Sequence, residues 1–231
     1  IIGPNGTKAQ IIGGGSATLV PYYESHPIEA FKSSLNENSL IRSSKGCHTY
    51  RYLPEINKSL TKEDGFLVEY FNVTEDGNDF ISSKVLTGSK FWIFEGFAKD
   101  IIGGDEKPDI LVKFSCTYTP NITGKHNFEI FAIGKSKLLI DETEVIDNWT
   151  NTSPGDAFFA HGTTSKRGGK VLKKNKTYKI EIQYKFEGNF PAIYIGCQPP
   201  DKIDLMDEAL KIAKEVEQVV LMVGTNSDWE T

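Results

Sequence analysis

The 231-residue sequence lacks an apolar run long enough to cross a membrane as a helix, which takes about 20 residues. It also lacks an excess of basic residues, because 26 Lys and Arg stand against 31 Asp and Glu and the formal charge is -5. A protein that binds the phosphate backbone gathers Lys and Arg on one face. We therefore expect no membrane anchor and no nucleic-acid partner. The densest basic segment, residues 166–174, contains two glycines, and we predict a solvated loop there.

Cysteines are few and far apart, at Cys47, Cys116 and Cys197. An odd count leaves at least one unpaired within the chain, and none has the spacing of a zinc site, so a disulfide scaffold is not expected. Cys116 and Cys197 lie in segments with strand-like alternation, where we expect small buried hydrophobic side chains. The histidines lack ligand spacing as well. The sequence predicts no metal and no cofactor.

The compartment stays open between intracellular and secreted. Asn-X-Ser/Thr sequons are present, but an Asn- and Thr-rich sequence produces them by chance. The chain begins at Ile1 without Met or a signal peptide, which suggests a fragment.

From about residue 60 the apolar residues alternate with polar ones. This period of two occurs in residues 66–71, 110–118, 126–133, 137–140 and 178–186. Gly, Pro, Asn and Asp separate these segments. Strands with one apolar and one polar face predict antiparallel sheets in a sandwich or barrel. We predict such a β body over residues 59–200.

Both ends of the chain have α/β character instead. Residues 219–223 form a short apolar run, typical of a buried parallel strand, and lead into an acidic loop. Open α/β sheets bind ligands at the carboxyl ends of such strands. A helix capped by Asp201 or Asp204 is predicted before this strand, and another from Pro27 to about residue 35. One helix and one strand cannot stabilise themselves, so we predict that the β body is inserted into a single α/β sheet domain.

Two resemblances to known families follow from these segments. The flanks resemble the C-terminal α/β sandwich domain of family-three glycoside hydrolases, the β-glucosidase family, at Ile-Gly-Pro-Asn (2–5), Gly-Gly-Gly-Ser-Ala (13–17) and residues 219–230. The middle resembles the sugar-associated β-sandwich domain named after the anthrax protective antigen, at residues 124–128, 137–141 and 145–149. Some yeast and bacterial β-glucosidases carry this sandwich inserted in the same order.

The predicted fold is mainly β, an antiparallel β-sandwich inserted into part of an α/β sandwich domain. Residues 1–58 are its first part, residues 59–200 the insert, and residues 201–231 the continuation. As partners the resemblance implies a β-glucoside substrate and the remainder of a glycosidase with a (β/α)8 barrel, and it leaves a homo-oligomer possible.

The resemblance implies a retaining hydrolase that acts on terminal β-linked glucose. Such an enzyme needs two carboxyl groups about 5 to 5.5 Å apart, and in the family the Asp nucleophile lies on the barrel, outside this chain. The acid/base is the second Glu of a Trp-Glu-Ser/Thr-Glu-Gly loop. Trp229, Glu230 and Thr231 match its first three positions, so the catalytic Glu is expected directly after Thr231. Glu230 is the weaker candidate, and Trp229 is expected to contact the substrate.

Residues 150–170 form a long polar loop that carries Phe158 and Phe159. Aromatic rings are costly to expose unless they stack on something, and sugar rings present apolar faces. We predict that the insert shapes the leaving-group side of the active site through these two rings. The alternative is that either ring packs beneath its own loop.

A stand-alone carbohydrate-binding module, of the lectin or adhesin type, is the alternative function. Yeast adhesins with this sandwich hold calcium through an adjacent Asp pair, whereas this chain has Gly-Lys-Ser-Lys at 134–137. We therefore expect no calcium site. The nearby acids Asp141, Glu142, Glu144 and Asp147 are expected in a turn followed by a strand. A purely structural spacer is the third class.

Overall fold

The computed structural model describes residues 1–231 except 63–64, 93–108, 189 and 230–231. The chain divides into two compact units, the first made of Ile1–Tyr52 with Asp201–Thr231 and the second of Leu53–Pro200. The second unit starts a little before residue 59 because residues 53–56 bind its sheet. Glu55 forms an antiparallel bridge with Gly196, and the Ile56 N–H donates to the Ser89 hydroxyl at 3.0 Å.

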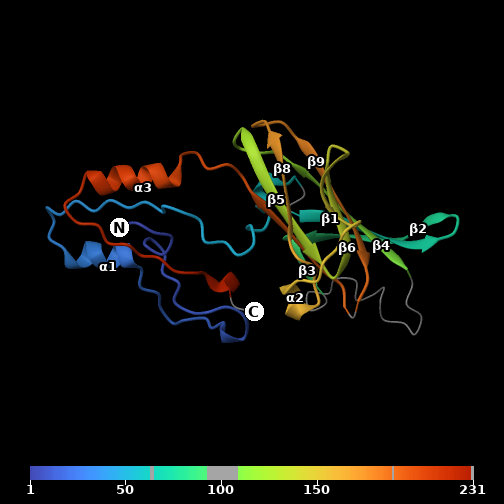
Figure 1. Cartoon of the computed structure of the whole chain (residues 1–231), viewed down its shortest axis with the longest axis horizontal. Coiled ribbons are helices and arrows are strands. Elements are labelled where there is room, and N and C mark those ends of the chain that lie inside the picture. The colour runs from blue at the N-terminus through green and yellow to red at the C-terminus, as the bar shows by residue number, and fades with distance from the viewer. Residues whose placement is uncertain (63–64, 93–108, 189, 230–231) are drawn as a thin grey trace. The chain divides into compact units, whose positions relative to one another are not determined.

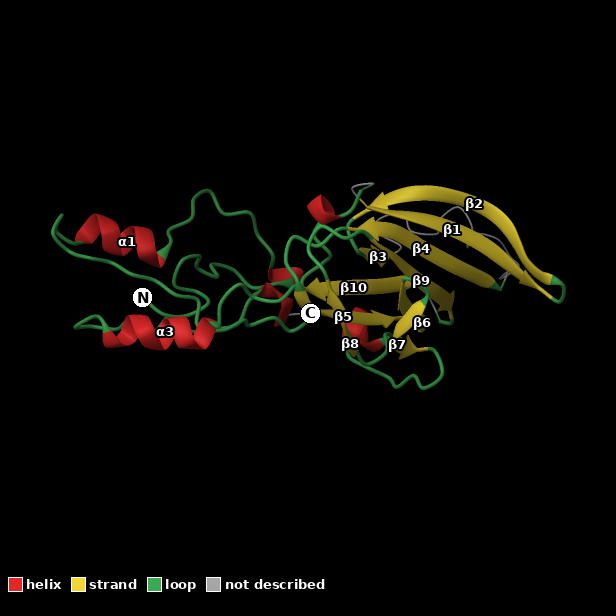
Figure 2. Ribbon diagram, turned by 90° about the horizontal axis from the view of Figure 1, so that it is seen from above, coloured by secondary structure: helices red, strands yellow, loops and turns green. Residues whose placement is uncertain are grey.

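The second unit consists of antiparallel strands. They are β1 (Gly65–Thr74), β2 (Gly77–Thr87), β3 (Lys90–Trp92), β4 (Ile110–Tyr118), β5 (Gly124–Ala132), β6 (Gly134–Ile140), β7 (Thr143–Asn148), β8 (Lys166–Leu172), β9 (Tyr178–Phe186) and β10 (Ala192–Gln198). In the described residues these form a six-stranded sheet, β2-β1-β4-β9-β6-β7, and a four-stranded sheet, β3-β10-β5-β8 (Figures 1 and 2). The prediction of a mainly β, antiparallel fold is confirmed.

The core lies between the two sheets and follows the predicted alternation. On β9, Ile180 and Ile182 are fully buried, while Lys179, which precedes Ile180 and points to the opposite face, is exposed. Phe91 of β3 stacks on Phe114 of β4 with ring centroids 5.1 Å apart, which joins the two sheets. Full burial of one such side chain stabilises the fold by about 1.5–3 kcal/mol. The period of two in the sequence therefore places the core.

The prediction of a solvated loop at residues 166–174 is wrong for most of that segment. Lys166–Leu172 is β8, an edge strand paired with β5. The glycines that suggested a turn allow close backbone approach instead. A Cβ on Gly168 would lie 2.2 Å from the Val145 carbonyl oxygen. A side chain at this position would push the neighbouring backbone away.

The first unit contains α1 (Pro27–Ser34) and α3 (Leu205–Lys214), as predicted. Asp204 caps α3, since its carboxylate accepts the N–H groups of Met206 and Asp207 at 2.9 Å each. Ile2 forms parallel bridges with Ser44 and Leu221. None of the helices that the structure describes is long and apolar enough to span a membrane.

The prediction that residues 219–223 form a buried strand is wrong, because most of these residues are exposed. This segment is extended and bonded to Ile2, through Ile2 N to Val220 O at 2.9 Å and Met222 N to Ile2 O at 2.8 Å. It forms only a single bridge among the described residues, and Leu221 is 65% exposed. A parallel strand is buried when neighbouring strands and helices cover it. The described residues supply one strand-like neighbour to this segment.

Candidate functional site

The loop after residues 219–223 turns back on itself and is held by polar contacts. Ser227–Trp229 forms a short 3-10 turn, and the Asn226 side-chain amide donates to Asp228 Oδ2 at 2.7 Å. The indole N–H of Trp229 donates to the Thr49 carbonyl oxygen at 2.7 Å, yet the side chain remains 49% exposed. Trp229 is thus anchored through its polar edge while about half of it is accessible. The weak catalytic candidate Glu230, and Thr231, lie outside the described residues.

A cleft of ≈ 490 Å³ adjoins this loop and is lined by Asn5, Gly224 and Thr225 among others. Within the described part of the chain, the buried amide oxygens of Asn5 and Asn226 have no hydrogen-bond partner. A buried acceptor without a donor costs about 1–3 kcal/mol. The two amide oxygens therefore reduce the stability of this region of the described chain.

The aromatic loop adopts a left-handed backbone. Phe158, Phe159 and Ala160 in α2 (Ala157–Ala160) have φ values of 51°, 59° and 62°. Left-handed backbone costs about 1–2 kcal/mol for each non-glycine residue. Two backbone hydrogen bonds close the loop, Gly155 N to Gly162 O at 2.8 Å and Gly162 N to Ala157 O at 2.9 Å. Strain of this kind persists where the surroundings fix it, and it concentrates at functional sites.

The two phenylalanines of this loop have different environments. Phe158 is 8% exposed and packs on Phe131 and Trp92, with ring centroids 5.4 and 6.3 Å away. Phe159 is 64% exposed and lies nearly parallel to Trp92, 6.2 Å between centroids. Phe158 packs beneath its own loop, the alternative considered above. Phe159 is the ring that the loop displays.

Trp92 contacts both phenylalanines of this loop and is a residue that the sequence analysis did not single out. In the sheet register Ala192 pairs with Trp92 and Tyr194 with Phe131, so these side chains share the face away from the core. Phe131 and Tyr194 stack with centroids 4.8 Å apart. The alternation along β10, with Ile193 buried, is the signal that could have placed Trp92 and Tyr194 outward.

Beside these rings lies the buried carboxylate of Glu129, both oxygens of which accept hydrogen bonds. Glu129 has no exposed surface and accepts from the guanidinium of Arg167, with Nε at 3.0 Å, and from the Leu53 N–H. The Tyr194 hydroxyl donates to the Leu53 carbonyl at 2.7 Å. Glu129 therefore acts as a structural acceptor, and not as a free acid.

Two of the four acids expected in a turn followed by a strand accept hydrogen bonds from the backbone. Asp147 Oδ1 accepts the N–H groups of Thr150 and Trp149, and these bonds hold the pKa of its carboxyl below the usual range. Asp141 Oδ1 accepts the Lys179 N–H at 2.9 Å. Lys135, in the Gly-Lys-Ser-Lys segment, pairs with Glu187 at 3.0 Å. Across the described ranges no group of three His, Cys, Asp or Glu side chains could hold a metal ion.

Comparisons with known proteins cover both units. The PA14 domain family matches residues 94–189. A probable β-glucosidase I from Aspergillus terreus is 30% identical over 100% of this chain, and a β-glucosidase from Rhizobium radiobacter is 27% identical over 100%. Over its whole length the chain is similar to β-glucosidases. The chain spans 29% and 28% of the length of those two relatives.

A solved structure with the same fold is the β-glucosidase from Kluyveromyces marxianus in complex with glucose. It has a TM-score of 0.72 and 21% sequence identity, and the match covers 100% of this segment and 29% of that chain. At this identity the likeness shows the fold. The residues that match the PA14 domain lie in the second unit, and the flanks on either side form the first.

Proposed function

We propose that the chain is part of a retaining β-glucosidase that removes terminal β-linked glucose from oligosaccharides or aryl glucosides. The observation that carries this proposal is the match to β-glucosidases over the whole chain, through both flanks as well as the PA14 domain. A lectin module would account for the PA14 residues alone. The flanks would then have no reason to match.

In this function the two units have different tasks. The first unit brings the loop with Trp229 to the acid/base side, while the nucleophile comes from a (β/α)8 barrel. The second unit was predicted to shape the leaving-group side. Phe159, supported by Trp92 and held by a strained turn, is the ring suited to stack on the leaving sugar. The insert, predicted as residues 59–200, is thus proposed as the wall of the active-site entrance.

Activity on two preparations tests the proposal. The intact protein that contains this chain should hydrolyse an aryl β-glucoside with retention at the anomeric carbon, observed by NMR of the first product formed. The 231-residue chain alone should give no hydrolysis, because the nucleophile is missing. Inversion, or hydrolysis by the isolated chain, would refute the assignment.

The lectin alternative makes a different prediction for the isolated chain. A stand-alone module should bind glucosides by calorimetry with full affinity, and the intact protein should show no hydrolysis. The exposed ring of Phe159 is the observation that favours this second function. Binding without hydrolysis in the intact protein would replace the enzyme proposal with the lectin.

A further inference from the structure

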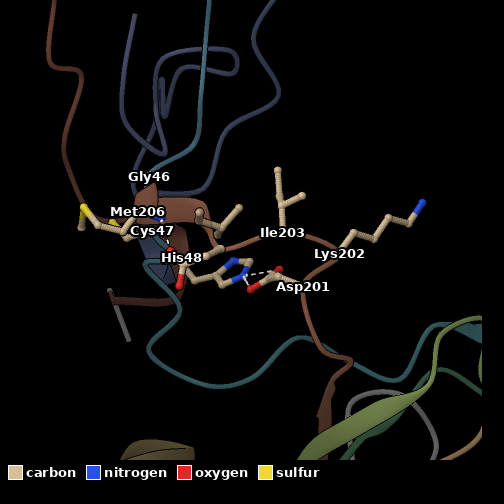
Figure 3. A pocket seen from close by; sticks show the side chains of 9 residues that line it. Gly46, Cys47, His48, Asp201, Lys202, Ile203 and Met206 are labelled. Carbon is tan, nitrogen blue, oxygen red and sulfur yellow. Dashed lines mark hydrogen bonds and ion pairs between the residues drawn. The ribbon is translucent and has the colours of Figure 1, made fainter. Parts of the chain in front are cut away.

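A polar network in the first unit joins the two points where the chain leaves it and returns. The first segment ends at Tyr52 and the second begins at Asp201. His48 Nε2 lies 2.9 Å from both carboxylate oxygens of Asp201 (Figure 3). On the other side of the ring, Lys45 Nζ lies 2.9 Å from His48 Nδ1. The network therefore fixes residues 45–48 against the start of the returning segment.

The donors and acceptors of this network define which ring nitrogen of His48 accepts a hydrogen bond and which donates one. A lysine ammonium has no acceptor, so His48 Nδ1 accepts from Lys45, and the Nε2–H donates to Asp201. Tyr50 completes the cluster, with its ring stacked on His48 at 5.0 Å and 4.9 Å from Lys45 Nζ. Ring packing and directional bonds together leave the His48 backbone little freedom.

The next residue carries this constraint to the loop after residues 219–223. Thr49 follows His48, and its carbonyl oxygen accepts the indole N–H of Trp229 at 2.7 Å. Trp229 ends the 3-10 turn of that loop. We propose that His48 and Asp201 are positioning residues for the acid/base loop, acting through the Thr49 carbonyl that holds Trp229. The proposal rests on the proposed function for its catalytic consequence, while the structural link stands by itself.

Hydrogen exchange of the Trp229 indole tests the link in the 231-residue chain. Trp229→Phe identifies the indole resonance among the three tryptophans. Asp201→Ala should accelerate exchange of that N–H by at least about tenfold, the effect of losing roughly 1.4 kcal/mol of protection. Asp201→Asn keeps an acceptor for His48 and should restore part of the protection. Unchanged exchange in Asp201→Ala would overturn the proposal.

The matched control is Glu215→Gln. Glu215 forms an ion pair with Arg42 in the same unit, its side chain is 39% exposed like that of Asp201, and it makes no contact in the network described above. Its removal should leave indole exchange unchanged. Equal acceleration in Glu215→Gln and Asp201→Ala would mean general loosening of the unit, and would overturn a specific positioning role.

Activity on substrates with different leaving groups distinguishes a positioning role from a simple loss of folded protein. A general acid matters most when the leaving oxygen is a poor leaving group. In the intact glycosidase, Asp201→Ala should lower kcat/KM for a β-linked glucose disaccharide by about tenfold, and for a dinitrophenyl β-glucoside by less than about twofold. An equal loss on both substrates would refute the positioning role. If the unmodified protein hydrolyses neither substrate, the proposed function fails, and indole exchange alone still judges the link.

Discussion

Replacement of Phe159 with Ala provides the most direct test of the aromatic loop. Phe159 is 64% exposed and its backbone is fixed by the closed turn, so the substitution removes a displayed ring and leaves the packing of Phe158 in place. The domain should therefore fold with nearly unchanged stability. Unfolding by urea checks this, and we expect a change below about 0.5 kcal/mol, as for surface substitutions generally.

The effect on a sugar that stacks there can be worked from the exposed area. A phenylalanine side chain buries about 200 Å² when fully covered, so 64% exposure leaves about 130 Å² accessible. A sugar ring that covers half of this buries about 65 Å² of the phenyl surface, worth about 1.6 kcal/mol at about 25 cal/mol per Å². This corresponds to roughly a tenfold change in affinity. KM for a disaccharide should rise by that factor in Phe159→Ala.

Steady-state kinetics of the intact enzyme on two substrates checks the reasoning. KM for disaccharides should rise more than KM for small aryl glucosides, because the leaving sugar reaches the loop. Phe80→Ala is the matched control, since Phe80 is 59% exposed on β2 in the other sheet. Equal effects of Phe159→Ala on both substrates, or the same effect from Phe80→Ala, would refute the stacking role.

Further predictions concern stability and reactivity. Arg167→Ala should lower the free energy of unfolding by about 2 kcal/mol, because it leaves the buried Glu129 carboxylate without its charged donor, and the partial exposure of Arg167 reduces the full cost. Urea unfolding measures this, and a loss below about 0.5 kcal/mol would contradict it. Burial lowers the pKa of His126 from 6.5, so the unfolded chain binds more protons: the stability contribution is complete above the unfolded pKa and is lost as pH falls from about 6.5 toward the folded pKa. Between pH 7 and pH 5 the free energy of unfolding should fall less in His126→Phe than in the unmodified protein. An identical fall in both proteins would exclude His126 as the cause. Burial raises the pKa of the Cys197 thiol to about 12, whereas Cys47 is exposed. Brief thiol labelling with mass spectrometry should modify Cys47 and spare Cys197 in the native protein, and rapid labelling of Cys197 would be inconsistent with the fold.

Much of the fold can be predicted from local patterns. Alternation along β9 and β4 predicts strands and the buried face, because the side-chain period of a strand is fixed by its backbone. Asp204 and Pro27 mark helix starts for similarly local reasons. Local patterns fail where pairing with a distant strand decides the secondary structure. The Gly-Gly pair in β8 indicated a turn, but the segment is a strand because it pairs with β5, and Gly168 lets it pass close to the Val145 backbone.

The sequence by itself determined the strand periodicity, the approximate helix starts, the resemblance to β-glucosidases and the two phenylalanines of the exposed loop. Only the tertiary structure decided that Phe159 is displayed while Phe158 is buried, and that Trp92 lies beside them. It alone paired His48 with Asp201 across 153 positions of sequence. Propensity and alternation depend on neighbours along the chain, whereas these contacts depend on sheet register and on where the chain returns after a long excursion. Those two properties belong to the folded chain as a whole.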